Sequence, residues 1–218
     1  SSDLNYIKRQ LQLELLGEVP VLSIRTEPLQ NPVNRLAKRL FDLTFSSLFL
    51  LTIFPFMYLI VGLIIKITSP GPIFFKQERN GENGKIFKCY KFRSMKVNAL
   101  SDSLQATKND PRKTKFGNFL RKSNLDELPQ FINVFKGEMS IVGPRPHMLK
   151  HTEEYSQLIN KYMMRHLVKP GITGWAQVTG YRGETKELSQ MEGRVRRDLW
   201  YIENWTFLLD IRIMIKTV

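Results

Sequence analysis

Two adjacent carboxylates, Asp126 and Glu127, stand in a segment that is otherwise strongly basic. Arg121 precedes them by about one helical turn, and more positive charge comes from Arg112, Lys113, Lys115 and Lys122. Mg²⁺ is typically held by one or two carboxylates together with the phosphates of a substrate, and an ionised aspartate can attack phosphorus. The pattern therefore predicts a site for a phosphorylated ligand and a divalent metal ion.

The same two carboxylates also have a simpler interpretation. Residues 126–137 have the pattern of a helix, with Ser123 or Asn124 as its N-cap and Gly137 as its C-terminal signal. Acidic residues in a first helical turn are stabilised by the helix dipole and by unpaired N–H groups. Position alone leaves both interpretations open, and the surrounding cations favour the phosphate site.

Three further basic residues are candidates for phosphate binding. Arg145 lies between Pro144 and Pro146, which fix the backbone, and a pre-positioned guanidinium suits bidentate contact with phosphate. Lys91 and Arg93 lie on a predicted strand, where alternation places them on one face. The alternatives are a rigid turn with a solvated arginine and a solvated strand face.

Residues 168–184 are rich in glycine, and Trp175 among them is suited to stack on a base or a sugar. Structural turns are the alternative, and the spacing matches neither a P-loop nor a dinucleotide-binding motif. His147, His151 and His166 form no metal cluster with a cysteine. His147 and His151 are four residues apart, so they can share a helix face, and a surface role is expected for them.

The elements that must position these residues are a hairpin and several helices. Residues 72–77 and 85–92 predict two strands joined by a turn rich in asparagine and glycine. Helices are expected at 116–122, 126–137, 149–166 and 186–203, followed by an apolar segment at 205–217. The predicted fold class is therefore α+β and helix-rich, with a small β-hairpin.

Residues 43–65 form an uncharged, strongly apolar run with Pro55 near its middle. Roughly 20 apolar residues suffice for a helix to cross a bilayer. Positive charge stands outside both ends, in Arg35, Lys38, Arg39, Lys66, Lys76 and Arg79. Because such charge marks the cytoplasmic side and proline bends a helix, we expect a re-entrant helix that returns to the face it entered. A plain kinked transmembrane helix is the alternative.

The chain of 218 residues carries a formal net charge of +13. Such an excess implies an anionic partner, and the apolar run favours anionic lipid or a phosphorylated substrate over nucleic acid. Cys89 is the only cysteine. An internal disulfide is thus excluded, a reducing compartment is indicated, and Cys89 is expected to be a packing residue.

Several strings along residues 35–218 carry a family resemblance. In chain order they are KRLFD (38–42), the proline-broken apolar run, SPGPIFFKQER, KFRSM, NDPR, FGNFLRKSNLDELPQFINVFKGEMSIVGPRP, KPGITGWAQVTGYRG and DLWYIENWTFLLDI. With them the chain resembles the bacterial sugar transferases, or monotopic phosphoglycosyl transferases, of the undecaprenyl-phosphate glucose phosphotransferase type. Phe54 precedes Pro55 where some members have serine, and Asn124 stands where serine is usual.

The resemblance implies a Mg²⁺-dependent enzyme that transfers a sugar-1-phosphate from a UDP-sugar, with a hexose expected, to undecaprenyl phosphate and releases UMP. It implies that Asp126 attacks the β-phosphorus and carries a covalent phosphosugar, and that Glu127 holds Mg²⁺. Pro55 would mark the kink of the membrane helix. The product would initiate assembly of exopolysaccharide, capsule or O-antigen. Phosphate or substrate binding is implied for five basic residues: Arg121, Arg145, Lys91, Arg93 and Arg112.

Three parts are expected along the chain. Residues 1–34 would form an amphipathic helix over 1–18 and a proline-rich linker, with a candidate edge strand at 21–26, leading from an upstream region outside this chain. Residues 35–67 would form the re-entrant helix. Residues 68–218 would form a catalytic domain on the cytoplasmic face of the bacterial inner membrane.

The partners implied are a UDP-sugar, undecaprenyl phosphate and inner-membrane lipid, with no nucleic acid and with a homodimer as one option. Interfacial amphipathic helices are part of the expected fold. Trp200, Tyr201 and Trp205 suit such an interface, and core packing is their alternative role.

Two other functions stay open at this level. One is direct transfer without a covalent intermediate, with Asp126 as a metal ligand. The other is a basic, membrane-tethered protein that binds nucleic acid or anionic lipid, which explains the charge and the apolar run but not two carboxylates among arginines. The identity of the sugar depends on the shape of a pocket and does not follow from the sequence.

Overall fold

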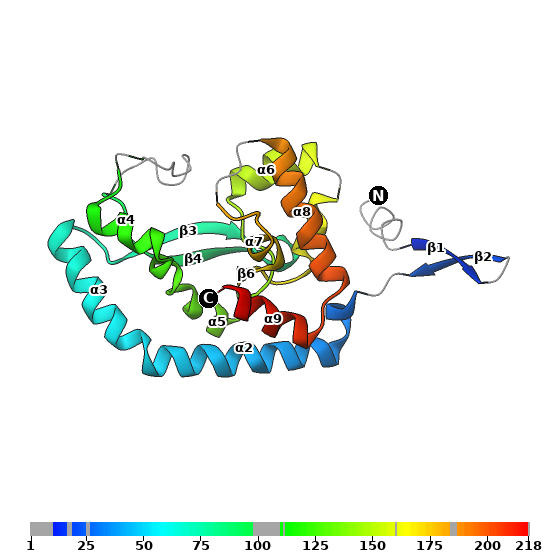
Figure 1. The fold of residues 1–218 in the computed structure, drawn as a ribbon, viewed down its shortest axis with the longest axis horizontal. Coiled ribbons are helices and arrows are strands. Elements are labelled where there is room, and N and C mark those ends of the chain that lie inside the picture. The colour runs from blue at the N-terminus through cyan, green and yellow to red at the C-terminus, as the bar shows by residue number, and fades with distance from the viewer. Residues whose placement is uncertain are drawn as a thin grey trace.

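A computed structural model has the predicted α+β, helix-rich architecture, which combines helices with small two-stranded sheets (Figure 1). The structure describes residues 11–16, 19–24, 27–97, 110, 112–159, 161–183 and 187–217. The strands are β1 (Leu11–Leu16), β2 (Val19–Ile24), β3 (Phe74–Asn80), β4 (Ile86–Phe92), β5 (Ser140–Val142) and β6 (Gly171–Thr173). The α-helices are α2 (Pro32–Thr52), α3 (Phe54–Thr68), α4 (Lys115–Lys122), α5 (Gln130–Lys136), α6 (Leu149–Leu158), α7 (Trp175–Val178), α8 (Leu188–Glu203) and α9 (Phe207–Thr217). Short 3₁₀ helices are η1 (Pro28–Gln30), η2 (Glu82–Gly84), η3 (Leu125–Glu127) and η4 (Tyr162–Leu167).

The longest helix, α2, runs along one side of the molecule and continues into α3 after a bend of 56° (Figure 1). Pro55 lies in the first turn of α3, where its missing N–H costs little, so the chain restarts there in a new direction. The predicted kink is thus confirmed. No single helix among the described residues is long and apolar enough to cross a membrane, whereas this bent pair is, by length and composition.

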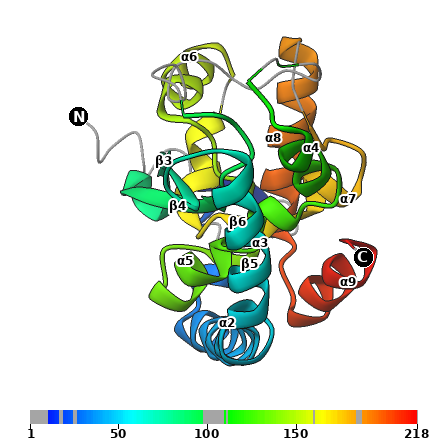
Figure 2. The same cartoon turned by 90° about the vertical axis from the view of Figure 1, so that its left-hand side faces the viewer.

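The two helices leave many large apolar side chains exposed while a second face packs inward. The exposed ones are Val33, Leu36, Leu40, Phe45, Leu48, Leu51, Ile53, Phe56, Tyr58, Leu59, Ile60, Leu63 and Ile67. On the inward face of α2, Phe49 packs against Phe131 of α5, with ring centroids 4.3 Å apart. On α3, Val61 and Ile65 share a core cluster with Phe92 and Leu120. Figure 2 shows α2 nearly end-on beneath α5.

The predicted hairpin is confirmed as β3 and β4, which pair antiparallel from Phe74 opposite Phe92 to Asn80 opposite Ile86. Asn133 ties the hairpin to α5, because its side chain accepts a hydrogen bond from the Tyr90 amide at 3.0 Å and donates to the Lys88 carbonyl at 2.8 Å. Cys89 is buried in the main core, as expected of a packing residue.

The amphipathic helix expected at 1–18 is wrong for residues 11–16, which form strand β1 and pair with β2; residues 1–10 lie outside the described residues. Leu11, Leu13 and Leu15 alternate with polar residues, and that period of two suits a strand better than a helix. The edge strand expected at 21–26 is observed as β2, two residues earlier.

The helix expected at 126–137 is also shorter than predicted. Leu125–Glu127 form a separate 3₁₀ turn, and α5 begins after Pro129. Neither expected N-cap acts, because the Ser123 hydroxyl donates to the Phe119 carbonyl and Asn124 adopts a left-handed conformation at φ 57°. The C-terminal signal is confirmed, with Gly137 at φ 83°.

The helix expected at 149–166 divides at Lys161, which has a left-handed φ of 64°. An α-helical segment, α6, precedes this break and the 3₁₀ helix η4 follows it. The helix predicted at 186–203 is observed as α8, and the apolar segment after it forms α9.

A buried polar network joins α2, α8 and α9. Asp210 is 1% exposed and accepts hydrogen bonds from three side chains: Lys38 at 2.5 Å, Tyr201 at 2.7 Å and Trp205 at 3.1 Å. Tyr201 and Trp205 therefore belong to the core, so an interfacial role is wrong for both, whereas Trp200 is 41% exposed. The network anchors the start of α2 to the C-terminal helices.

We expect Asp210→Ala to lower the free energy of unfolding by about 3–5 kcal/mol, because Lys38 would stay buried without its counter-charge. Chemical unfolding in detergent, followed by circular dichroism, measures this. Arg212→Ala, exposed on the same helix, serves as the control and should cost little. Equal losses in the two variants would contradict a structural role for this network.

Candidate active site

An open pocket of about 770 Å³ lies along the β3–β4 hairpin. All seven residues predicted for substrate, phosphate or metal binding line it: Lys91, Arg93, Arg112, Arg121, Asp126, Glu127 and Arg145. Asp126 and Glu127 come from η3, and Arg145 comes from the loop between β5 and α6. Tertiary structure thus gathers residues that are up to 54 positions apart, from 91 to 145, in the sequence.

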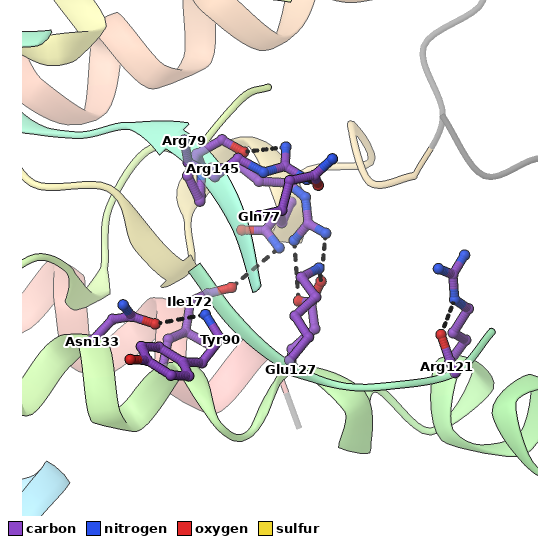
Figure 3. A network of polar contacts seen from close by, with 12 residues as sticks. Gln77, Arg79, Tyr90, Arg121, Glu127, Asn133, Arg145 and Ile172 are labelled. Carbon is purple, nitrogen blue, oxygen red and sulfur yellow. Dashed lines mark hydrogen bonds and ion pairs between the residues drawn. The ribbon is translucent and has the colours of Figure 1, made fainter. Parts of the chain in front are cut away.

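The centre of the pocket is Glu127, which two cations hold. Its Oε1 accepts from Lys91 Nζ at 2.6 Å and from Arg145 Nη2 at 2.6 Å, and its Oε2 accepts from Arg145 Nη1 at 3.2 Å. Figure 3 shows Arg145 and Glu127 pointing toward each other. Although burial opposes ionisation, Arg145 and Lys91 together hold the pKa of Glu127 well below its usual range. Glu127 is therefore a fixed negative charge.

We call the ion-paired group of Lys91, Glu127 and Arg145 the clamp. Residues outside the pocket hold the backbone around it in place. Arg165 is buried and forms an ion pair with Asp198 at 2.6 Å, and it also donates to the Arg145 carbonyl at 2.9 Å. The β5–β6 contact adds a second restraint, since the Gly171 amide donates to the Pro144 carbonyl at 2.9 Å. The rigidity that the two prolines predict is thus reinforced by long-range hydrogen bonds.

Asp126 lies beside the clamp in a different state. It is 7% exposed, and its carboxylate accepts no hydrogen bond from any of the described residues. Burial raises its pKa, and the charge of Glu127 adds to that effect, whereas Lys91, Arg121 and Arg145 oppose it. A desolvated carboxylate with nearby cations and no hydrogen bond is suited to attack an electrophile that carries negative charge.

The other three arginines have partners in the protein. Arg121 lines the pocket and donates from Nε to the Ser94 hydroxyl at 2.7 Å; this contact is drawn in Figure 3. Arg112 forms a bidentate pair with Asp110, at 2.9 and 2.6 Å. Arg93 donates to the carbonyls of Ser69 and Pro70 at the end of α3.

Lys91 and Arg93 thus line the pocket together but bind different groups. Lys91 contacts Glu127, whereas Arg93 supports the turn after the apolar helix. The close approach of the chain near this turn also requires Gly117, because a Cβ there would lie 1.8 Å from the Ser94 carbonyl oxygen. Ser94 and Gly117 help to form the site; both lie within strings that carry the family resemblance, KFRSM and FGNFLRK, but neither was predicted as a site residue.

The carboxylates in the pocket can hold Mg²⁺ only if a bound ligand supplies further oxygen atoms. Among the described residues there is no group of three or more His, Cys, Asp or Glu that would hold a metal ion. Asp126 and Glu127 provide two carboxylates, and Oε2 of Glu127 accepts only one hydrogen bond, which leaves a lone-pair site. That arrangement suits an ion bound by one or two carboxylates and completed by substrate phosphates.

Two expectations about neighbouring residues are corrected. Trp175 does not line this pocket; it stacks on Trp200, with ring centroids 5.0 Å apart, and the glycines near it allow backbones to pack closely. His147 is not a surface residue, because it is 4% exposed and lines the pocket together with His151. The spacing of four residues between His147 and His151 was the one sequence feature that indicated that the two side chains could lie on the same side.

We expect Lys91→Met to raise the pKa of Asp126 further, since it removes the cation that lowers that pKa most. Carbon-13 NMR of protein labelled at the aspartate carboxyl carbons, assigned with Asp126→Asn, measures the shift. Lys88→Met is the matched control, because Lys88 is exposed on the same strand. The electrostatic account of Asp126 fails if the two lysine variants titrate alike.

Comparison with known proteins gives the family. Residues 33–218 match the bacterial sugar transferases. The chain is 55% identical over 208 residues to the Escherichia coli K12 protein named UDP-glucose:undecaprenyl-phosphate glucose-1-phosphate transferase, covering 95% of this chain and 44% of that protein. It is 51% identical over 210 residues to the Klebsiella pneumoniae protein of the same name, covering 96% and 45%.

The chain thus spans less than half the length of these two relatives. It is also 45% identical over 186 residues to the exopolysaccharide production protein PSS of Rhizobium leguminosarum, with 83% of this chain and 92% of that shorter protein covered. The carboxylate pair, the arginines around it and the match over nearly the whole chain lead to one conclusion: the chain belongs to the bacterial sugar transferase family.

Proposed function

We propose that this chain transfers a sugar-1-phosphate, with glucose-1-phosphate the first candidate, from a UDP-sugar to undecaprenyl phosphate. The observation that carries the proposal is the pair of unlike carboxylates: Asp126 is desolvated and accepts no hydrogen bond from a described residue, beside Glu127, which two cations hold ionised. The names of the two relatives that are 55% and 51% identical to this chain support the donor and the acceptor.

In the first step a carboxylate oxygen of Asp126 attacks the β-phosphorus of the UDP-sugar. The bond between that phosphorus and the bridging oxygen breaks, and UMP leaves with the bond's electron pair. The product is an acyl phosphate in which the phosphosugar is attached to Asp126. Arg121 and Arg145 lie where they would bind phosphoryl oxygens as negative charge moves onto the leaving group.

In the second step a phosphate oxygen of undecaprenyl phosphate attacks the same phosphorus. The bond to the Asp126 oxygen breaks, which regenerates the carboxylate and yields the diphosphate-linked sugar. One phosphoanhydride replaces another through the enzyme, so no ATP is required. The lipid-linked product would serve to initiate exopolysaccharide, capsule or O-antigen assembly.

Mg²⁺, when bound with the donor, neutralises part of the charge on its diphosphate. Glu127, through the free lone-pair site of Oε2, would hold it. The clamp then has two functions: it fixes the carboxylate that faces the ion, and it keeps Lys91 and Arg145 next to the phosphates.

We further propose that α2 and α3 enter the cytoplasmic face of the bacterial inner membrane and return to it. The bend, the exposed apolar side chains and the basic residues at both ends support this placement. Phe74, which lines the pocket, packs on Tyr58 of α3 with ring centroids 5.5 Å apart, so the pocket adjoins the inserted helix. The lipid phosphate could then react without moving its chain into water, which would cost about 0.8 kcal/mol per CH₂.

We expect this protein in nanodiscs to release UMP from one UDP-sugar of a panel, with Mg²⁺ present, and to stop when Mg²⁺ is chelated. Asp126→Asn should lower the rate by at least about a thousandfold, because it removes the attacking oxygen. Glu78→Gln, an exposed change on β3, is the matched control.

Omitting the acceptor separates covalent from direct transfer. A single turnover of UMP release, with the phosphosugar retained on the protein, is the expected result of a covalent route. UMP release that strictly requires undecaprenyl phosphate would favour direct transfer. If no donor released UMP, with or without the acceptor, the result would instead favour a membrane-tethered protein that binds nucleic acid or anionic lipid.

The membrane placement has its own test. Leu36→Cys and Thr68→Cys, each made with Cys89→Ser, stand at the two ends of the bent pair. In sealed inside-out vesicles, a membrane-impermeant thiol reagent should label both positions, because a re-entrant helix keeps both ends on one face. Labelling of only one position would show a spanning helix instead.

A further inference from the structure

The pocket is elongated, and its two ends differ in chemistry. Along β3 it runs from Phe74 and Phe75 to Arg79. Phe75 lies opposite Lys91, which contacts Glu127, whereas Arg79 pairs with Met148 beside His147. Four residues of strand separate these points, or about 13 Å at the usual rise of a strand. The pocket thus extends well beyond the two carboxylates.

One end adjoins the apolar helix α3 and combines apolar groups with three cations: Pro72, Phe74, Phe75, Met95 and Val97, and Arg93, Lys96 and Arg112. The other end, which we call the histidine arm, is polar and basic. It comprises Arg79, His147, His151, Arg182, Gly183 and Arg194. If the lipid acceptor arrives along α3, the histidine arm is left for the donor.

His147 carries the strongest sign of a ligand in this arm. Its Nδ1 lies 2.6 Å from the Tyr162 hydroxyl, and its Nε2 is buried and has no hydrogen-bond partner within the described part of the chain. Burial and the charge of Arg165 hold the pKa of His147 well below its usual range, so the ring is neutral. A buried polar nitrogen without a partner is costly, and in a ligand pocket it indicates a group still to be bound.

Two tautomers of the neutral ring fit the contact between Nδ1 and the Tyr162 hydroxyl. Either Tyr162 donates to Nδ1 and Nε2 carries the proton, or Nδ1 donates to Tyr162 and Nε2 is an acceptor. In both tautomers Nε2 can form a hydrogen bond with a polar group of a ligand.

Arg194 shapes the rest of the arm. It is buried and donates to the carbonyls of Tyr181 and Gly183, at 3.2 and 2.8 Å, and so holds the loop that presents Arg182 to the pocket. The Arg182 side chain has no hydrogen-bond partner among the described residues. Together with Arg145, these cations suit an anionic ligand portion and not a neutral sugar.

We propose that the histidine arm binds the UMP half of the donor, with His147 Nε2 forming a hydrogen bond with the nucleoside and Arg182 contacting the α-phosphate. This inference rests on the proposed transferase function. The sugar would then lie near Asp126, and the leaving group would lie in the histidine arm. A nucleotide contains both an anion and hydrogen-bonding groups of the base and ribose, which suit the cations and the imidazole of the arm.

Direct binding of UMP tests the proposal without requiring turnover. Isothermal titration calorimetry of the full chain in nanodiscs should give a Kd for UMP that is about tenfold or more weaker in His147→Phe, which keeps an aromatic ring and loses the hydrogen-bonding nitrogen. Binding of inorganic phosphate should not change in this variant. KM for the UDP-sugar should rise with kcat nearly constant, as for an interaction shared by ground and transition states.

His166→Phe is the matched control. Both ring nitrogens of His166 are buried without partners, and burial lowers its pKa to about 4, but it does not line the pocket. UMP binding should therefore be unchanged. If His147→Phe does not fold, as judged by its thermal transition, Arg182→Gln decides the matter, with weaker UMP binding expected.

Two results would overturn the proposal in distinguishable ways. A wild-type protein that releases UMP, together with folded His147→Phe and Arg182→Gln variants that bind UMP as tightly as wild type, refutes the histidine arm and leaves the transferase function standing. A wild-type protein that neither releases nor binds UMP refutes both.

Discussion

The structure depends on one largely buried carboxylate, Glu127, whose side chain is 13% exposed and whose charge must be compensated inside the protein. Lys91 and Arg145 provide that compensation from two other segments, so the 3₁₀ turn, the hairpin and the Pro-Arg-Pro loop have to meet at one point. A buried charge without partners is strongly destabilising. The need to pair Glu127 therefore constrains the fold around the site, and Asn133 and Arg165 restrain the same segments from behind.

The clamp also sets the character of Asp126. Two adjacent carboxylates in one pocket compete for the same cations, and the hydrogen bonds from Lys91 and Arg145 go to Glu127. Asp126 is left desolvated, with a raised pKa and with cations that act only through space. One carboxylate becomes a permanent charge and its neighbour a reactive group, a division of roles that arises from environment because their chemistry is nearly identical.

The bent helix pair connects this site to its surroundings. Helix α2 is held at its start by the buried Lys38–Asp210 ion pair and at its centre by aromatic packing on α5. Helix α3 ends at a turn that Arg93 supports, directly beside the pocket. The same apolar helices that leave large side chains exposed therefore pack against the residues of the site, so the exposed apolar surface and the pocket belong to one continuous part of the structure.

The sequence by itself determined the local features: the break at Pro55, the β3–β4 hairpin, the cap at Gly137 and seven of the residues that line the pocket. These follow from proline and glycine geometry, from periodicity and from charge patterns, which act over a few residues. Residues 11–16 are also a local matter, because they form a hairpin with the next segment, although a helix was predicted there. Only tertiary structure decided that His147 is buried, that Glu127 is doubly paired and Asp126 is not, because each depends on segments far apart in sequence.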